Sequence, residues 1–372
     1  MDPKISNVTN KYNKTTFTLS NCNLPIANGI RRTVLSDIPI LVMKCLLPDE
    51  DLIDIFYNTS NLNNEVLKLR ISSIPVCIQN ITDFNTENIV IELNIENSTT
   101  SIMTVTSEHF KIKDKILNKY LPQEKVKEIF PPNDLSGDFI DIVRLKPKLS
   151  EEIPGEKISL EAKLSVGTAQ EDGMFNVVST MSFGNTIDIN QQQVELSKIK
   201  QTWKDLKMNE KEILYEEKNW LLLEGQRIFL PNSYDFIIEN IGIYNNYELL
   251  SKSVYILSEK LDFLLENFGD SKVISVVDSE NTMSNCFDVI IENEDYTIGK
   301  IIQDKLYTEY FPTGILTYCG FKKDHPHDSH SIIRLAYKEP SDTNFIKQNF
   351  ESVFGIIKNE FNKILKELKK TK

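Results

Sequence analysis

Three of the four histidines of this 372-residue chain lie within six residues and are accompanied by an aspartate, at His325, His327, Asp328 and His330. Imidazole and carboxylate groups are ligands for zinc and iron, and Cys319 lies a few residues upstream. A metalloenzyme would also need an open coordination position and a general base, a role open to Asp324 or Asp328. One hypothesis is therefore a metal-dependent enzyme or a metal-binding protein.

Other catalytic signatures are missing from the sequence. There is no phosphate-binding loop, no nucleophile elbow of the G-x-S-x-G type and no H-E-x-x-H zinc motif. There is also no D-x-D-G-D frame, with which a polymerase centre would hold two metal ions. The sequence therefore predicts no catalytic residues and no cofactor.

Composition excludes several further classes. The net charge of -12 disfavours a stand-alone DNA-binding module, and the lysine-rich end at Lys366, Lys369, Lys370 and Lys372 is interpreted as a solvated helix terminus. The five cysteines form no C-x-x-C pair, which predicts a reducing compartment. The first residues do not resemble a signal peptide, and no apolar run reaches the roughly 20 residues that span a bilayer. We expect an intracellular, soluble protein that does not contact a membrane.

Two distant segments, residues 17–32 and 289–304, share one pattern: an extended apolar run, an Asn/Asp turn and then a helix. A gap-free alignment places Leu19 on Ile291, Ile26 on Ile298, Ala27 on Gly299 and Ile30 on Ile302. Arg31 and Arg32 meet Gln303 and Asp304. Because the apolar positions repeat and the basic pair does not, the halves can pair with each other and still present different outward faces.

Local signals bound the helix of each repeat. Asn23 can cap the first helix, which starts near Leu24 and must end before Pro39. The second starts at 295 or 296 and must end before Pro312.

Two longer helical patterns follow the repeats. Apolar residues recur in the first at Leu250, Val254, Leu257, Leu261, Leu264, Leu265 and Phe268. They recur in the second at Phe350, Val353, Ile357, Phe361, Ile364, Leu365 and Leu368. Leaving one such stripe in water would forgo on the order of 10 to 20 kcal/mol, so each helix must pack against a partner face.

The middle of the chain reads differently. Strand patterns occupy 89–96, 101–106, 139–145 and 158–166, and a helical pattern covers about 193–223, with Trp203, Leu206, Ile213 and Leu214 on its apolar positions. A β-rich domain of this size can be inserted into another domain at small entropic cost. We therefore predict an α+β fold: a discontinuous first dimerisation domain (1–43 and 228–270), an insert domain (44–227) and a second dimerisation domain (271–372).

These segments resemble a known family. Residues 24–39, Leu-Pro-Ile-Ala-Asn-Gly-Ile-Arg-Arg-Thr-Val-Leu-Ser-Asp-Ile-Pro, are similar to the alpha motif of multisubunit RNA polymerases, which occurs in the third-largest eukaryotic subunit, in its archaeal counterpart and in the bacterial alpha subunit. Residues 294–306, 318–326 and 332–335 resemble the small partner of that subunit in archaea and eukaryotes. Further segments of the larger partner are matched by 63–75, 162–174 and 234–242. The chain thus resembles a fusion of both alpha-like subunits, of the kind found in large DNA viruses.

The resemblance implies a non-catalytic subunit of a DNA-directed RNA polymerase. Its two pseudo-symmetric alpha-type domains would form an intramolecular heterodimer, the assembly platform for the largest and second-largest subunits. A small subunit would lie near the platform, and DNA would be reached only through the complex. By position, Asn28, Arg31 and Arg32 would contact the second-largest subunit, since an arginine fork suits carboxylates and carbonyls. A viral subunit would be found in the host cytoplasm and the virion.

Internal pairing would be carried by apolar residues of the two repeats and the two long helices. These are Ile26, Ile30, Leu250, Val254, Leu257, Leu261, Leu264, Ile298, Ile302, Phe350, Val353, Ile357, Phe361 and Ile364.

The chain departs from the family at several positions. Gly29 stands where the family has Ala or Ser, and Lys300 and Gln303 replace Asn and Arg. No cysteine lies between Cys77 and Cys286, so the metal site of many family inserts is not expected. His325 and Pro326 coincide with a hairpin turn of the small partner, which favours a turn over a metal site.

Overall fold

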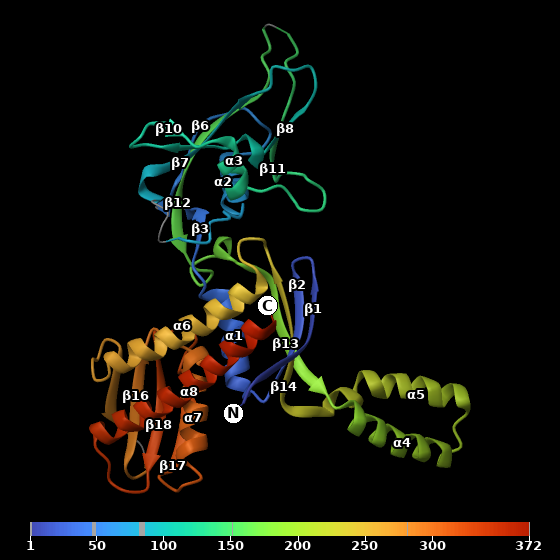
Figure 1. Ribbon diagram of the computed structural model, residues 1–372, viewed down its shortest axis with the longest axis vertical. Coiled ribbons are helices and arrows are strands. Elements are labelled where there is room, and N and C mark those ends of the chain that lie inside the picture. Colours follow the sequence, from blue (N-terminus) through green and yellow to red (C-terminus); the bar gives the residue numbers. More distant parts are fainter. Residues whose placement is uncertain (1, 47–49, 82–85, 151, 281, 372) are drawn as a thin grey trace. The chain divides into compact units, whose positions relative to one another are not determined.

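The computed structural model describes residues 2–46, 50–81, 86–150, 152–280 and 282–371 (Figure 1). Two compact units are formed: a terminal unit of residues 1–33, 180–239 and 250–372, and a central unit of residues 34–179 and 240–249. The described residues contain eight α-helices and several sheets, which confirms the α+β class. None of the described helices is both long and apolar enough to cross a membrane.

The first sheet of the terminal unit carries the amino-terminal repeat. Its strand order is β1 (Lys4–Lys11), β2 (Lys14–Ser20), β14 (Phe229–Asn240) and β13 (Val178–Ile187). Phe17 lies opposite Phe236 in the register, and their rings stack with centroids 5.0 Å apart. Helix α1 (Leu24–Ser36) follows β2, so its predicted start and end are confirmed.

The second sheet carries the carboxy-terminal repeat. Its antiparallel order is β15 (Ile274–Asp278), β16 (Cys286–Glu292), β18 (His330–Tyr337) and β17 (Leu316–Lys322). Helix α7 (Tyr296–Tyr310) follows β16 within its predicted limits. The side chain of Asp295 caps α7 by accepting a 2.7 Å hydrogen bond from the backbone N–H of Thr297.

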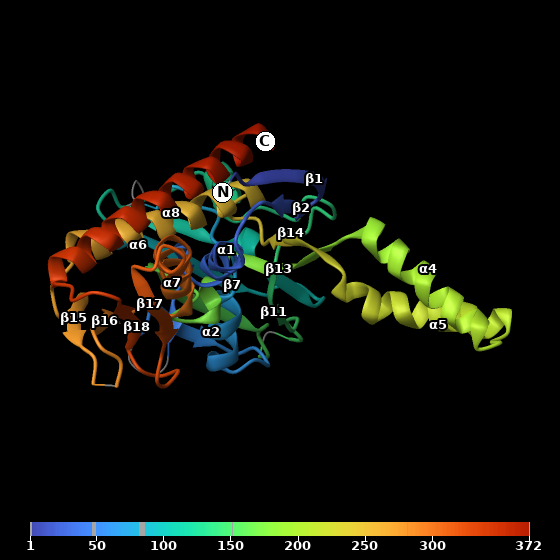
Figure 2. The same ribbon diagram turned by 90° about the horizontal axis from the view of Figure 1, so that it is seen from below.

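The two predicted long helices are α6 (Asn246–Glu266) and α8 (Thr343–Thr371). They run side by side in both ribbon views (Figures 1 and 2), and Lys358 of α8 is paired with Asp262 of α6 at 2.6 Å. The sequence places large apolar residues at three- and four-residue spacing along each helix, and this stripe is the buried side.

The helical pattern at 193–223 is not one helix. It is a hairpin of α4 (Ile189–Asp205) and α5 (Glu210–Leu222). Lys207 has a φ of 59°, which ends the first helix, and Asn209 caps the second. Leu206 and Leu214, expected on apolar helix positions, are 69% and 54% exposed, so that part of the prediction was wrong.

The central unit is β-rich. Six strands form one sheet, with β10 (Lys119–Tyr120), β9 (Lys111–Asp114), β7 (Ile89–Glu96), β12 (Lys157–Gly167) and β3 (Ile40–Met43) in order and β6 (Ile53–Asn58) also paired with β12. Two smaller pairs are β8 (Met103–Thr106) with β11 (Asp141–Leu145) and β4 (Cys45–Leu46) with β5 (Glu50–Asp51). Helices α2 (Asn64–Ser72) and α3 (Gln123–Ile129) complete a core that includes Phe110 and Phe130.

Candidate subunit interface

Helices α1 and α7 of the terminal unit approach each other closely at Gly29 and Ile301. A Cβ atom on Gly29 would lie 2.6 Å from Cδ1 of Ile301 and 3.7 Å from the carbonyl oxygen of Thr297. Carbon atoms cannot approach to 2.6 Å, so glycine is the residue that fits without a shift of Ile301. The close approach to Ile301 thus gives a packing reason for glycine at position 29.

The residues predicted to pair the halves are all buried. Those on α1 and α7 are at most 3% exposed: Ile26, Ile30, Ile298 and Ile302. Those on α6 and α8 are likewise at most 3% exposed: Leu250, Val254, Leu257, Leu261, Leu264, Phe350, Val353, Ile357, Phe361 and Ile364. Each is worth about 1.5–3 kcal/mol as an upper estimate, so this packing is a main source of stability in the terminal unit.

Both long helices contact the first sheet in one core. A void of about 10 Å³ is lined from α6 by Leu250 and Val254, and from α8 by Ile364 and Leu368. The remaining lining comes from strands β1, β2 and β14 and from α1: Ile5, Phe17, Leu19, Phe236 and Ile30. Residues from the two ends of the chain therefore share one apolar seam.

Polar contacts of Arg32 and Asn23 join the first repeat to the second. The Nε of Arg32 donates to Oγ1 of Thr297 at 2.7 Å, and its guanidinium forms a short ion pair with Asp295. The Nδ2 of Asn23 donates to Oδ2 of Asp304 at 2.7 Å. In the gap-free alignment Asn23 corresponds to Asp295, and Arg32 corresponds to Asp304. Position 32 of the first repeat thus contacts the residue aligned with position 23, and position 23 contacts the residue aligned with position 32.

Burial sets the electrostatics of this seam. It raises the pKa of Asp304, and the hydrogen bond from Asn23 offsets only part of that rise. Burial also acts to raise the pKa of Asp295, but the bonds from Thr297 and the charge of Arg32 outweigh it, so the pKa is lowered. The roles of these carboxylates in the seam were missed by the sequence analysis, because the alignment shows which positions are equivalent and not which residues meet.

A buried ion pair lies next to this seam. Lys305 of α7 and Glu360 of α8 are joined at 2.6 Å, and their side chains are only 5% and 7% exposed. Removing one partner would leave the other charge buried and unpaired, which is strongly destabilising. The pair thus joins α7 to α8 within the core of the terminal unit.

The residues predicted to contact a partner subunit lie on one turn of α1. Arg31 donates from Nε to Oδ1 of Asn28 at 3.0 Å, and partial burial together with Arg32 lowers the pKa of Arg31. The equivalent pair on α7 is reversed, since Nζ of Lys300 donates to Oε1 of Gln303 at 3.0 Å. Arg32 is engaged with the second repeat, whereas a role of Asn28, Arg31 and Arg32 toward a partner remains a prediction.

The histidine-rich segment forms a turn between β17 and β18. The backbone N–H of His325 donates to Oδ2 of Asp328 at 2.8 Å, and the N–H of His327 donates to Nδ1 of His325 at 3.1 Å. His330 belongs to β18, opposite Glu292. Across the described parts of the chain, no three His, Cys, Asp or Glu side chains are arranged to hold a metal ion. The residues of the alternative hypothesis are thus near one another in sequence but do not form a ligand set.

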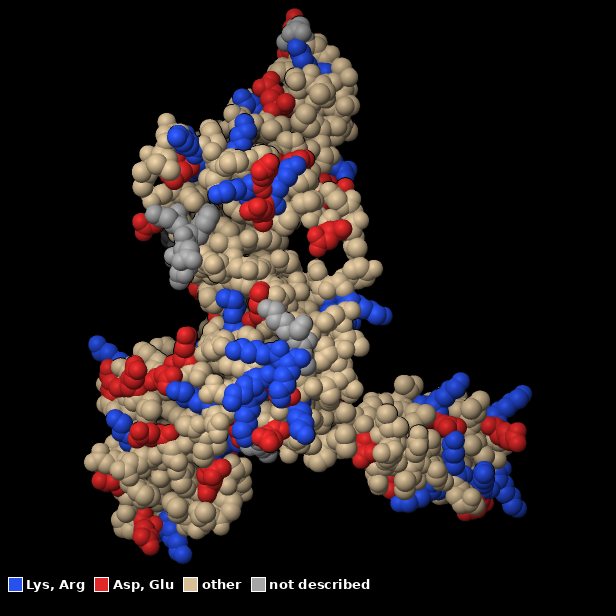
Figure 3. Space-filling model, in the orientation of Figure 1, with Lys and Arg blue, Asp and Glu red and all other residues tan. Residues whose placement is uncertain are grey.

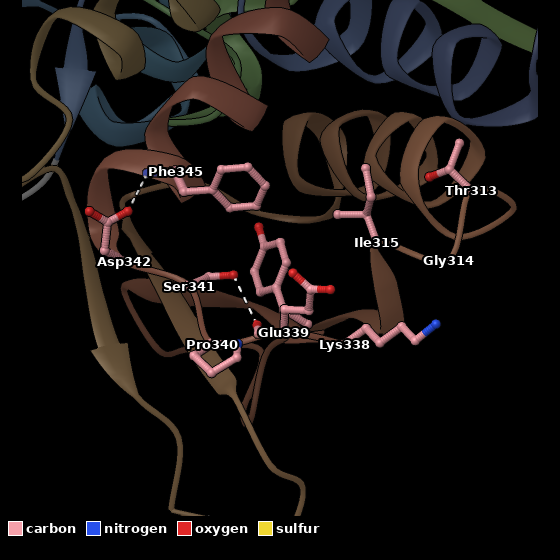
Figure 4. A pocket seen from close by; sticks show the side chains of 10 residues that line it. Thr313, Gly314, Ile315, Lys338, Glu339, Pro340, Ser341, Asp342 and Phe345 are labelled. Carbon is pink, nitrogen blue, oxygen red and sulfur yellow. Dashed lines mark hydrogen bonds between the residues drawn. The ribbon is translucent and has the colours of Figure 1, made fainter.

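A large groove of the terminal unit lies at the start of α8 (Figure 4). It measures about 790 Å³, and its apolar lining includes Ile315, Phe345 and the buried ring of Tyr337, whose pKa burial raises to about 12. Asp342 caps α8 by accepting from the N–H of Phe345 at 2.9 Å, and Ser341 donates to the carbonyl of Glu339 at 3.2 Å. Two of the groove's polar side chains thus stabilise the turn and the helix.

Comparison with known proteins identifies RNA polymerase subunits as relatives. No family model matches the chain. It is 25% identical over 294 residues to the DNA-directed RNA polymerases I and III subunit RPAC1 of Saccharomyces cerevisiae, covering 67% of this chain and 82% of the relative. It is 23% identical over 272 residues to the DNA-directed RNA polymerase subunit Rpo3 of Pyrococcus furiosus, covering 66% of this chain and 89% of that relative.

A third relative is matched over a shorter region. The chain is 25% identical over 193 residues to the DNA-directed RNA polymerases I and III subunit rpac1 of Dictyostelium discoideum, 48% of this chain, and spans about half of that relative's length. All three relatives are subunits of RNA polymerases by name.

Proposed function

We propose that this chain is a non-catalytic subunit of a DNA-directed RNA polymerase, in which the two chain ends form an intramolecular alpha-like heterodimer. This heterodimer is the platform on which the largest and second-largest subunits assemble. The relatives, which are polymerase subunits at low identity, support the polymerase role.

The observation that carries the platform proposal is the reciprocity of the contacts between the repeats. Arg32 binds Asp295. In the alignment Asp304 is equivalent to Arg32 and Asn23 is equivalent to Asp295, and Asp304 binds Asn23. Gly29 meets Ile301, the residue aligned with it. Contacts of residue i with j and of j with i are the property of a two-fold interface. We infer that the repeats are related by a pseudo-two-fold axis through the crossing of α1 and α7.

The division into a discontinuous domain (1–43 and 228–270), an insert (44–227) and a small-partner-like domain (271–372) is part of this proposal. In this proposal the second-largest subunit is contacted by Asn28, Arg31 and Arg32. The equivalent positions on α7 are occupied by Lys300, Gln303 and Asp304. A viral source and a location in the virion stay predictions.

Coexpression with the two largest subunits of the same source tests the platform role. The tagged chain is expected to co-purify with both subunits. Arg31→Glu is expected to release the second-largest subunit and leave the melting temperature nearly unchanged, because the side chain of Arg31 bonds to Asn28 on its own helix. Arg144→Glu is the matched control, since that arginine is 73% exposed and lies in the central unit.

Arg32 needs a compensated variant, because its charge also serves the internal seam. Arg32→Asp alone is expected to lower the melting temperature. Adding Asp295→Arg restores the internal ion pair but neither the partner contact nor the cap of α7, so the melting temperature should lie between those of Arg32→Asp and the parent. The double variant should fold and still fail to retain the second-largest subunit. Full retention by both Arg31→Glu and this double variant would show that the assigned contact is wrong, and failure of the parent chain to co-purify would reject the platform.

A further inference from the structure

Positive charge is concentrated at the two ends of an acidic chain. Residues 3–36 contain three lysines and two arginines without a single Asp or Glu, and residues 361–372 contain five lysines and one glutamate. The net charge of the whole chain is -12. The sequence between the two ends is therefore strongly acidic.

The fold brings the two basic ends together within the terminal unit. Nζ of Lys363 on α8 lies 2.8 Å from Oδ1 of Asp2, and Lys363 and Lys4 both lower the pKa of Asp2. Ile5 of β1 and Ile364 of α8 line the same internal void. Lysine and arginine side chains gather over this part of the molecule (Figure 3). We call the surface of Lys4, Lys363, Lys366, Lys369 and Lys370 the terminal basic face.

The face keeps an excess of positive charge. Asp2 is paired with Lys363, and Glu367 is paired with Lys370. Lys366 and Lys369 are exposed and form no ion pair with any residue that the structure describes. Cations in a last helical turn interact favourably with the helix dipole, but that effect is confined to about one turn and does not account for Lys4 at the start of β1.

The geometry points to an acidic segment of another protein as the ligand of the terminal basic face. Residues three or four apart on a helix are about 5–6 Å apart, and side chains on one side of an extended peptide repeat about every 6.6 Å. Carboxylates on one side of an extended Asp- or Glu-rich segment therefore match the spacing of Lys366 from Lys369 and from Lys370 on α8. Lysine acts as a point charge, which suits separate carboxylates.

Nucleic acid fits this face less well. Binding of single strands uses exposed aromatic rings on which bases stack, and the only aromatic residue among 361–370, Phe361, is 1% exposed. The acidic remainder of the chain also repels a phosphate backbone, and a DNA duplex carries about one charge per 1.7 Å against about one per 6.6 Å for alternate carboxylates of an extended peptide.

The test measures binding of the full-length chain to a fluorescent peptide of alternating Glu and Ser, with an oligothymidylate of equal length as the competing ligand class. The triple variant Lys366→Gln, Lys369→Gln and Lys370→Gln is expected to weaken peptide binding by about tenfold, because each lost exposed charge contributes about a factor of two. Affinity for the parent chain should also fall steeply with added salt, because these charges are exposed.

The control variant is Lys198→Gln, Lys204→Gln and Lys211→Gln on α4 and α5, which removes the same charge from another exposed surface. Lys198 is paired with Glu195 three residues away, as Lys370 is with Glu367. The control should bind the peptide like the parent, and both triple variants should keep the parent's melting temperature. Equal weakening by both variants, no binding of the peptide at low salt, or tighter binding of the oligothymidylate would each overturn the proposal.

Discussion

Gly29→Ala tests the close approach between the two repeats. The new methyl group would lie 2.6 Å from Cδ1 of Ile301, a fully buried side chain. Overpacking of this kind costs about 1–3 kcal/mol, whereas replacing a helical glycine by alanine gains about 0.5–1 kcal/mol. We therefore expect a net loss of about 0.5–2 kcal/mol in the free energy of unfolding.

A second substitution makes the measurement specific. Ile301→Val removes the methyl group that the introduced alanine would strike and by itself costs about 0.5–1.5 kcal/mol. In the double variant the two changes compensate, so a double-mutant cycle should give a favourable coupling of about 1–2 kcal/mol. Urea unfolding followed by circular dichroism supplies the four free energies.

Gly355→Ala provides the matched control. Gly355 is an exposed interior residue of α8, and a Cβ atom there would have no neighbour within 4 Å. This substitution should stabilise the protein by about 0.5–1 kcal/mol through helix propensity alone. If Gly29→Ala stabilises to the same extent, or if the cycle shows no coupling, the two helices do not approach as closely as described.

Three further substitutions test the charged groups. Asp288→Asn removes the negative charge and one of the two acceptors of the 2.7 Å bonds from Arg334, which lower the pKa of Asp288 below 3.8. The pair therefore stabilises fully above about pH 4, and the expected loss of about 1–3 kcal/mol should vanish in acid as the carboxylate is protonated; a pH-independent loss in melting scans would contradict this. Glu360→Gln should lower the free energy of unfolding, measured in urea, by about 3–5 kcal/mol, because Lys305 is left buried and unpaired. Replacing both residues by Met should recover most of this loss. A double variant as unstable as Glu360→Gln would argue against the pair. Burial raises the pKa of Asp304, so the folded state loses stability as pH rises through that pKa. Asp304→Asn should therefore be at least as stable as the parent at neutral pH. A lower melting temperature of this variant at neutral pH would refute the raised pKa of Asp304.

The sequence predicted those parts of the fold that depend on local signals. Asn23 and Pro39 delimit α1, and the apolar spacing along 250–268 and 350–368 identified α6 and α8 with their buried sides. The hairpin of α4 and α5 was missed because no Gly or Pro interrupts residues 193–223. The capping signal of Asn209 is the local sign of a second helix in this segment. There the turn depends on Lys207 in a left-handed conformation, which lysine rarely adopts.

The contacts of the candidate interface were only partly predictable. Periodicity identified the apolar seam residues, since burial of a stripe is a property of one helix. Which polar residues meet is a property of two helices, and Asn23 and Asp304 are 281 residues apart. The alignment of the repeats shows that the contact of Arg32 with Asp295 and the contact of Asn23 with Asp304 occupy equivalent positions, but it does not show that these residues meet. Arg32 was assigned to a partner contact on the basis of family position.

The contact of Gly29 with Ile301 has a consequence for how this protein can change over time. In a dimer of identical chains, one nucleotide change alters both members of a central contact at once, so a small residue cannot face a large one there. In the pseudo-two-fold pairing proposed above, the two members are separate codons of a single gene. Each side of the crossing can be substituted alone, and the other can later adjust to it, while the two halves are always produced in equal amounts.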